Sequence, residues 1–153
     1  MTIRDATPAD APACADVYGD AVRAVGPQRY TAEQTAAWAG WADDPDAFGR
    51  LLRRGRAWVA EDERGAAGFV TLEPDGRVGM LYVRGDRQRL GLGRRLLAVA
   101  LGAAEEAGRR QVYAEASAFS LPLFLSAGFA VVEVETVVRE GVSFERNRVE
   151  RRL

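Results

Sequence analysis

Two glycines separated by one residue, Gly91 and Gly93, stand out in the stretch "LYVRGDRQRLGLGRRLL" from Leu81 to Leu97. The apolar residues before them predict a strand, and the leucine-rich residues after them predict a helix. Glycine lacks a side chain and adopts positive φ at little cost, so the backbone there can approach a ligand closely. The first N–H groups of a helix have no internal partner, and the helix dipole places partial positive charge beside them. The spacing therefore predicts a site for an anion such as a phosphate or pyrophosphate.

Three arginines, Arg89, Arg94 and Arg95, add positive charge around these glycines. Two other glycine motifs fit the stretch less well. The phosphate-binding P-loop requires a lysine, and this chain contains none. The dinucleotide-binding fingerprint requires glycine or alanine where Leu96 stands, and it belongs to the first strand-to-helix turn of its fold. The sequence therefore satisfies neither nucleotide-binding fingerprint, and a nucleotide-binding module is kept only as an alternative.

The composition excludes several classes of chemistry and partner. All 21 basic residues are arginine and the chain has no histidine, so neither a histidine base nor a histidine metal ligand is available. The net charge of −1 gives no bulk attraction for nucleic acid or an anionic membrane. The single cysteine, Cys14, cannot form an internal disulfide, which fits a reducing compartment, and its helical spacing predicts a buried position. We expect a cytoplasmic protein without nucleic-acid or membrane partners and without a bound metal.

The elements that must position the glycines follow from turn and capping signals, and they predict an α/β (α+β) fold in one domain, residues 1–153. Glycines in the turns "ERG" and "PDG" predict a meander of three antiparallel strands ending in "RVGMLYV". The helix after the glycines should cross over right-handed to a parallel strand, "QVYAEAS". The other expected elements are a first strand "TIRDA", a helix from about Pro8 to Ala24, short helices after Thr31 and Asp44, a short helix in "SLPLFLSAG" and a final hairpin around Glu140-Gly141.

The stretch resembles the acyl-CoA-binding motif of the GNAT superfamily of N-acyltransferases, written Q/R-x-x-G-x-G/A, with Gln88, Gly91 and Gly93 at its fixed positions. The element order is similar to that family over nearly the whole chain. The segments "YTAEQTAAWA", "YAEAS" and "LPLFLSAGF" are similar to a bacterial subgroup of uncharacterised acetyltransferases. The resemblance implies a mixed, mostly antiparallel central sheet flanked by helices. It also implies a splay between the strands that hold Leu81–Val83 and Tyr113–Ser117.

The resemblance implies acetyl-CoA as the co-substrate and gives individual residues a role in binding it. Leu81 and Val83 should hydrogen-bond the pantetheine arm through their backbone, while Ser117 and Phe124 flank that arm from the other side. Gln88 opens the motif. The pyrophosphate should lie against the backbone of the six residues that follow, which are Arg89, Leu90, Gly91, Leu92, Gly93 and Arg94.

The catalytic groups are less complete than the binding motif. Many relatives carry a tyrosine that protonates the departing thiolate, in a segment resembling P-F-Y-x-x-x-G-F, and Phe124 stands at that position here. Glu115, on the splayed neighbouring strand, is the first candidate base, and the alternative is that it forms an ion pair or faces solvent. Glu33 is a second candidate base, and its alternative role is to favour the start of a helix. Tyr82 could act through water, or simply be a core aromatic. Tyr30, Glu33 and Trp38 lie in the segment where this family recognises its acceptor.

The function implied is transfer of an acetyl group to a primary amine of a small molecule or peptide. Because position 124 holds phenylalanine and not tyrosine, a second hypothesis stays open, namely a non-catalytic acyl-CoA-binding module. The β-branched run "VVEVETVV" in the final hairpin could present an edge to a second copy, so a homodimer is expected as an alternative to coverage by the chain's own helices.

Overall fold

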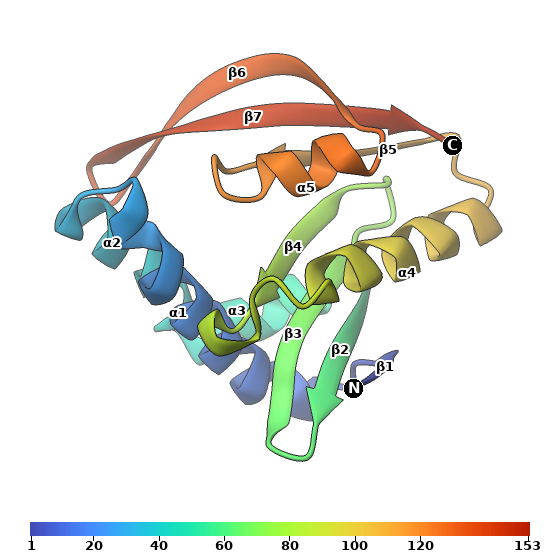
Figure 1. The fold of residues 1–153 in the computed structure, drawn as a ribbon, viewed down its shortest axis with the longest axis horizontal. Coiled ribbons are helices and arrows are strands. Elements are labelled where there is room, and N and C mark those ends of the chain that lie inside the picture. Colours follow the sequence, from blue (N-terminus) through green and yellow to red (C-terminus); the bar gives the residue numbers. More distant parts are fainter.

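The computed structural model describes all residues, 1–153, and contains every strand and helix that the sequence predicts. Figure 1 shows their arrangement. In chain order the elements are β1 (Thr2–Asp5), α1 (Ala11–Val25), α2 (Ala32–Ala39), α3 (Pro45–Leu52), β2 (Arg56–Asp62), β3 (Gly65–Leu72), β4 (Val78–Val83), α4 (Leu92–Glu106), β5 (Gln111–Ala116), α5 (Leu121–Ser126), β6 (Ala130–Arg139) and β7 (Val142–Arg152).

The helix predicted from Pro8 begins later than expected. Residues Pro8–Asp10 form a separate 3₁₀ turn, and α1 starts at Ala11. The capping signals of the two short helices are confirmed. The hydroxyl of Thr31 accepts a bond from the backbone N–H of Gln34, and the carboxylate of Asp44 accepts two backbone N–H groups at the start of α3.

The strands form two antiparallel sheets that meet at one point. The first sheet has the order β1-β2-β3-β4 and the second has the order β5-β7-β6. Between β4 and β5 the structure has a single parallel bridge, from Arg77 to Tyr113. Beyond that bridge the two strands diverge, so the edge of β4 from Gly79 to Val83 has no strand partner. This is the splay that the sequence resemblance implied.

Helices cover the two faces of the first sheet, because alternate residues of each strand point to opposite sides. On one face Val59 and Phe69 pack with Cys14 and Val17 of α1 and with Phe48 of α3. On the other face the neighbouring strand residues pack against α4 in a larger cluster, which includes Trp58, Ala60, Val70, Leu96 and Ala100. Cys14 is buried, as predicted, and burial raises the pKa of its thiol to about 12. These two clusters fix α1 and α4 against the sheet and so fix the segment that joins β4 to α4.

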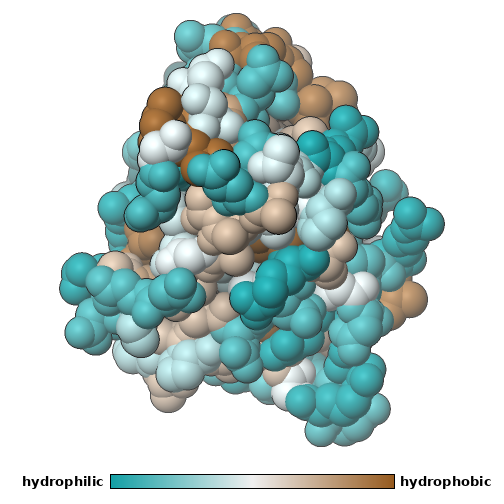
Figure 2. Space-filling model, turned by 90° about the vertical axis from the view of Figure 1, so that its left-hand side faces the viewer, coloured by the Kyte–Doolittle hydropathy of each residue, from teal (hydrophilic) through white to brown (hydrophobic).

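The β6–β7 hairpin extends across the top of the molecule and reaches α2 at its tip (Figure 1). The amide of Gln34 donates to the backbone carbonyl of Ser143 at 3.0 Å, which ties α2 to the hairpin. Figure 2 shows apolar side chains gathered at the top of one face, over this hairpin. Val134 and Val138 of β6 are 61% and 66% exposed, and the outer edge of β6 is unpaired. The homodimer through this strand stays a prediction. No helix is long and apolar enough to span a bilayer.

Candidate active site

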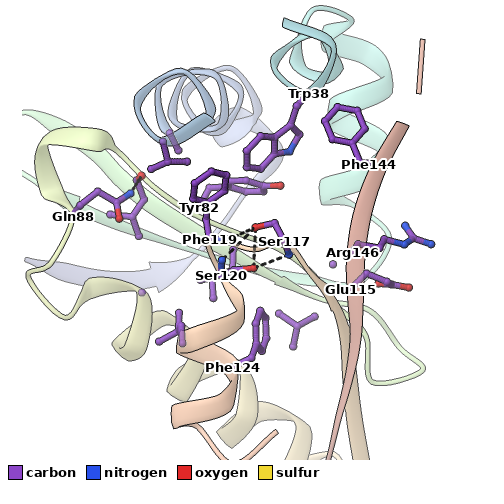
Figure 3. A pocket seen from close by; sticks show the side chains of 18 of the residues that line it. Trp38, Tyr82, Gln88, Glu115, Ser117, Phe119, Ser120, Phe124, Phe144 and Arg146 are labelled. Carbon is purple, nitrogen blue, oxygen red and sulfur yellow. Dashed lines mark hydrogen bonds between the residues drawn. The ribbon is translucent and has the colours of Figure 1, made fainter. Parts of the chain in front are cut away.

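A cavity of about 420 Å³ lies in the splay between β4 and β5 and continues toward α2 and the hairpin tip. Its glycine end is formed by residues of the glycine loop, which we define as residues 84–93, and by α5. Its aromatic end, which we define as Tyr30, Trp38, Trp41, Phe119 and Phe144, lies beside α2 (Figure 3). Most residues predicted to bind the co-substrate line this cavity: Leu81, Val83, Gln88, Arg89, Gly91, Leu92, Gly93, Arg94, Ser117 and Phe124.

The free edge of β4 presents backbone groups to the cavity. The backbone N–H of Arg84 bonds to Ala67, and that of Met80 bonds to the side chain of Thr71, so even-numbered residues of β4 point their N–H groups at β3. By alternation the N–H and C=O groups of Leu81 and Val83 point to the open side. The amide of Gln88 already donates to the carbonyl of Val83 at 2.7 Å. Gln88 therefore holds the loop against β4, and the backbone groups of Leu81 remain for a ligand.

The start of α4 has the geometry that an anion site requires. Gly91 caps the helix with φ +76°, and a Cβ placed there would meet no atom within 4 Å, so its open side faces free space. Arg89 also has positive φ, 63°, which is uncommon for a residue with a side chain. Leu90, which was also predicted to bind the co-substrate, is 67% exposed and does not line the cavity.

Gly93 has a packing role in addition to the binding role that the sequence predicts. A Cβ at Gly93 would lie 3.2 Å from the side chain of Leu123. Glycine here lets the first turn of α4 pack closely against α5, in addition to lining the cavity. A side chain added at Gly91 would therefore enter only open space, whereas one added at Gly93 would also contact Leu123.

Two polar contacts anchor the glycine loop from distant parts of the chain. Arg87 is buried and bonds to the carboxylate of Asp62, at the end of β2, at 3.0 Å. The backbone N–H of Gly85 donates to the carboxylate of Asp20, on α1, at 2.8 Å. Sequence reasoning missed both contacts, because nothing in the local pattern shows that α1 and β2 lie beside this loop.

The opposite wall of the glycine end is the turn that leads into α5. The hydroxyl of Ser117 accepts the backbone N–H of Ser120 at 3.2 Å, and the hydroxyl of Ser120 accepts the N–H of Ser117 at 3.1 Å. These reciprocal bonds close the turn and point both hydroxyls along the cavity wall (Figure 3). Phe124 is 3% exposed and packs edge-on against Phe129 with ring centroids 5.0 Å apart. The ring of Phe124 offers the cavity an apolar surface and no proton.

Glu115 lies on the cavity wall in an ion pair. Its Oε2 accepts the Nε–H of Arg77 at 2.8 Å, and Arg77 also bonds to Glu73 at 2.7 Å. Glu73 does not line the cavity, whereas Glu115 and Arg77 do. Arg77 thus satisfies one oxygen of Glu115 and leaves the other, Oε1, without a protein hydrogen bond.

Tyr82 lines the cavity but is packed among other aromatic rings. Its ring centroid lies 4.6 Å from that of Tyr18 and 5.9 Å from that of Phe69. Burial raises the pKa of Tyr82, so its hydroxyl stays protonated near neutral pH. A tyrosine in this state can relay a proton but does not act as a tyrosinate base.

The aromatic end brings together rings from three separate segments: residues 30–41, the turn after β5, and β7. The ring of Tyr30 lies 5.5 Å from Trp38, 5.4 Å from Phe119 and 5.4 Å from Phe144, measured between centroids. Tyr30 and Trp38 were predicted acceptor residues, and the structure places both on the cavity. Glu33, the third predicted residue, is exposed at the start of α2 and does not line the cavity.

Several residues of the cavity were not found from the sequence. Phe119 follows β5, Phe144 and Arg146 are on β7, and Arg139 ends β6. At the start of β7, Val142 and Phe144 alternate with Ser143 and Glu145, a pattern that predicts an inward-pointing Phe144. The pattern does not show that the hairpin tip reaches α2. That contact joins segments more than 100 residues apart, as the bond from Gln34 to Ser143 shows.

A family model described as an acetyltransferase (GNAT) domain matches residues 27–150. No protein among those of curated function matches the chain. Among solved structures, a GCN5-related N-acetyltransferase from Rhodopseudomonas palustris has a TM-score of 0.95 at 24% identity, covering 99% of this chain and 95% of that chain.

Two similar structures contain coenzyme A or acetyl-CoA. PaiA N-acetyltransferase from Thermoplasma acidophilum, in complex with coenzyme A, has a TM-score of 0.81 at 14% identity, and all of both chains is covered. YncA from Salmonella typhimurium, solved with acetyl-CoA, has a TM-score of 0.70 at 25% identity, covering 100% of this chain and 94% of that chain. The fold is thus shared over nearly the full length.

Proposed function

The chain belongs to the GNAT family of acetyltransferases, and we propose that it transfers an acetyl group from acetyl-CoA to a primary amine of a small molecule. The resemblance carried by Gln88, Gly91 and Gly93 is confirmed by the family match over residues 27–150. The observation that supports the proposal most strongly is the unpaired edge of β4, which leads directly into the positive-φ start of α4 along one cavity.

The cavity fits coenzyme A in chemistry as well as in shape. The pantetheine arm carries amide groups, and the free backbone groups of Leu81 can pair with such a group as one strand pairs with another. The pyrophosphate is an anion, and the first N–H groups of α4, which follow Gly91, have no partner within the helix and lie at its positive end. Arg89 and Arg94 line the same end and add positive charge. When bound, the acetyl thioester supplies an activated acyl group.

The reaction requires a neutral amine, since an ammonium ion has no lone pair with which to attack. An amine of pKa ~10.4 is only about one part in a thousand neutral near pH 7.4, which is equivalent to roughly 4 kcal/mol. In the transfer the amine nitrogen forms a bond to the acetyl carbon, the carbon–sulfur bond breaks, and the amine loses a proton. We propose that Glu115 receives this proton, directly or through one water, at its free Oε1.

The other steps require a hydrogen-bond donor and a leaving group. The N–H groups of β4 that point into the splay can stabilise negative charge that develops on the carbonyl oxygen. Phe124 cannot protonate the thiolate. A thiol of pKa ~8.5 is a fair leaving group without protonation, so the loss of a proton donor at this position lowers the rate without abolishing transfer.

A specific observation supports one second candidate, an acyl-CoA-binding module without turnover. Phe124 is buried with no hydroxyl, and Glu115 is held in an ion pair with Arg77. Such a protein would keep the glycine loop and the free edge of β4. It would bind acetyl-CoA and release no thiol when an amine is added.

The test is to incubate the protein with acetyl-CoA and a panel of primary amines while measuring free thiol and acetylated amine. We expect amine-dependent thiol release, matched one for one by acetylated product. The chain has no lysine, so acetylation of lysine side chains on the enzyme adds no background. Tight acetyl-CoA binding without amine-dependent thiol release would favour the binding module. Stabilisation against heat by ATP or NAD, and not by coenzyme A, would overturn both candidates.

A further inference from the structure

Arg139 is the last residue of β6, and its side chain lines the cavity close to the aromatic end. Its guanidinium carbon lies 3.5 Å from the centroid of the Trp41 ring. The side chain is half-buried, yet none of the ion pairs in the structure includes it, and it makes no side-chain hydrogen bond. A half-buried charge without a partner is costly, so this arginine requires an explanation.

The other arginines in this part of the cavity are neutralised by carboxylates. Arg77 bonds to Glu73 and Glu115, and Arg146 bonds to Glu135 at 2.8 Å. Arg139 instead faces further positive charge. Burial lowers its pKa, and repulsion from Arg146 and Arg77 lowers it further. Glu145 also lines the cavity but is exposed and forms no ion pair with Arg139. Because a guanidinium stays protonated in proteins, Arg139 carries a positive charge that no ion pair in the structure balances.

Trp41 holds the guanidinium in an orientation suited to a planar anion. A short distance to the ring centroid is typical of a cation–π contact, in which the guanidinium lies over the ring face. The N–H groups on its edge then remain free, and a carboxylate can accept two of them in parallel. Trp41 is thus a positioning residue for Arg139.

The surroundings of Arg139 also limit what else the acceptor carries. The rings of Tyr30, Trp38, Phe119 and Phe144 lie within 5.4 to 5.9 Å of a neighbour in the group, and all four line the cavity. Figure 3 shows Trp38 and Phe144 on one side of the space, and Tyr82, Phe119 and the serines of the α5 turn further in. An apolar body fits against these rings, while the amine of the same molecule must reach the splay beside Glu115.

We propose that the acceptor is an amino carboxylic acid with an apolar body, and that Arg139 binds its carboxylate. This inference rests on the proposed function, because it assigns the acceptor of the same cavity. A primary amine without a carboxylate would leave Arg139 unpaired, and a peptide amine would carry a neutral amide where the carboxylate is needed. The acceptor is therefore a free amino acid rather than a protein.

The experiment compares L-phenylalanine with two probes that lack the carboxylate: phenethylamine, which has no group at that position, and phenylalanine amide, which has a neutral amide there. With the wild type, we expect kcat/KM for phenylalanine to exceed that for either probe by about 10- to 100-fold, the range for loss of a charge-assisted hydrogen-bonded pair. Arg139→Gln should raise KM for phenylalanine by a similar factor and leave phenethylamine nearly unchanged. Arg139→Lys should recover part of the loss, since it keeps the charge without the planar fork.

Arg152→Gln is the matched control, because Arg152 is exposed on the same hairpin and lies outside the cavity. It should behave as the wild type. Calorimetric binding of phenylalanine to the protein saturated with coenzyme A gives a readout independent of turnover, and Arg139→Gln should weaken it.

Two results separate the inference from the proposed function. Transfer to phenethylamine or phenylalanine amide as efficient as to phenylalanine, with Arg139→Gln equal to the wild type, overturns the inference and leaves the acetyltransferase intact. Absence of thiol release with every amine overturns the proposed function. In that case, binding of phenylalanine that is weakened by Arg139→Gln still supports the carboxylate site, and binding that is unaffected by Arg139→Gln rejects it.

Discussion

At the glycine end of the cavity, consecutive residues supply the binding groups through their backbone, whereas at the aromatic end side chains from three distant segments supply them. The glycine loop runs without interruption from β4 into α4. The aromatic end joins Tyr30 and Trp38 to Phe119 and Phe144, and Arg139 comes from the hairpin tip. A backbone site can be recognised from a short motif, because the motif dictates its geometry. A side-chain site depends on how the whole chain folds.

The two ends also differ in how their charge is balanced. At the glycine end, positive charge comes from the dipole of α4 and from Arg89 and Arg94, and a phosphate would balance it. At the aromatic end, Arg77 and Arg146 are already paired with glutamates and Arg139 is not. Three substitutions test this comparison. One is at Glu115, at the junction where the two ends of the cavity meet, and two are at the glycine end.

The largest effect is expected at the junction, from Glu115→Gln. If Glu115 receives the proton of the amine, its amide variant should lower kcat/KM by about 10²-fold at pH 6.5, where the amine is almost entirely protonated. The deficit should shrink as the pH rises toward the pKa of the amine, because the amine then arrives neutral. The measurement is kcat/KM between pH 6.5 and 9.

Glu73→Gln is the matched control for that profile. Glu73 bonds to the same arginine, Arg77, at 2.7 Å, but it does not line the cavity. Each variant removes one ion-pair partner of Arg77, so loss of an ion pair alone would lower kcat/KM equally in both. Should the two variants show the same pH profile, Glu115 is a structural partner of Arg77 and the base lies elsewhere.

An intermediate effect is expected from Gly91→Asn, which places a side chain in the open space at the start of α4. Asparagine tolerates positive φ better than most residues, so the free protein should still fold. Its side chain would obstruct the close approach of an anion to the backbone N–H groups. We expect calorimetry to show coenzyme A binding about 10- to 100-fold more weakly, the range for losing a charge-assisted hydrogen bond.

Gly108→Asn tests whether that loss comes from the ligand or from the fold. Gly108 follows the same helix at its other end, has φ +78° against +76° for Gly91, and also has no atom within 4 Å of an added Cβ. Both variants should melt at similar temperatures, and only Gly91→Asn should lose affinity for coenzyme A. Equal affinity in the two variants would place the anion away from Gly91.

The smallest effect is expected from Phe124→Tyr, which restores the hydroxyl that many relatives have. If the thiolate departs without a proton donor, turnover should stay within about tenfold of the wild type, below the ~10²-fold effect typical of a general acid. Phe124→Leu should also retain turnover to within the same factor. It should lower the melting temperature, because it removes the edge-on contact with Phe129. If the tyrosine variant instead turns over about a hundredfold faster than the wild type, thiolate protonation limits the rate.

The sequence predicted the elements of the fold well for identifiable reasons. Thr31, Asp44 and the turn glycines act on their immediate neighbours, so the helix starts and the strand meander could be predicted locally. Gln88, Gly91 and Gly93 lie within six residues of each other, and their order predicted a site whose residues the structure places along one cavity. The role assigned to Gly93 was incomplete, because its contact with Leu123 of α5 arises only when the helices pack.

The other features of the site could not be predicted, because they depend on contacts between segments that are distant in the sequence. The anchoring of the glycine loop by Asp20 and Asp62 follows from the packing of α1 and β2 around it. The pairing of Glu115 with Arg77 follows from the single bridge between β4 and β5. Arg139 belongs to the cavity only because the hairpin tip reaches α2. None of these pairings has a signature in residue type or spacing.

The most direct test of a single cavity with two functional ends is the binding of a conjugate that joins them. In the conjugate, the sulfur of coenzyme A is linked through an acetyl bridge to the amino nitrogen of phenylalanine. By calorimetry, the wild type should bind this conjugate at least about tenfold more tightly than coenzyme A. Arg139→Gln should reduce the affinity of the conjugate to that of coenzyme A, and Gly91→Asn should weaken both ligands. A conjugate that binds no more tightly than coenzyme A to the wild type would contradict the account.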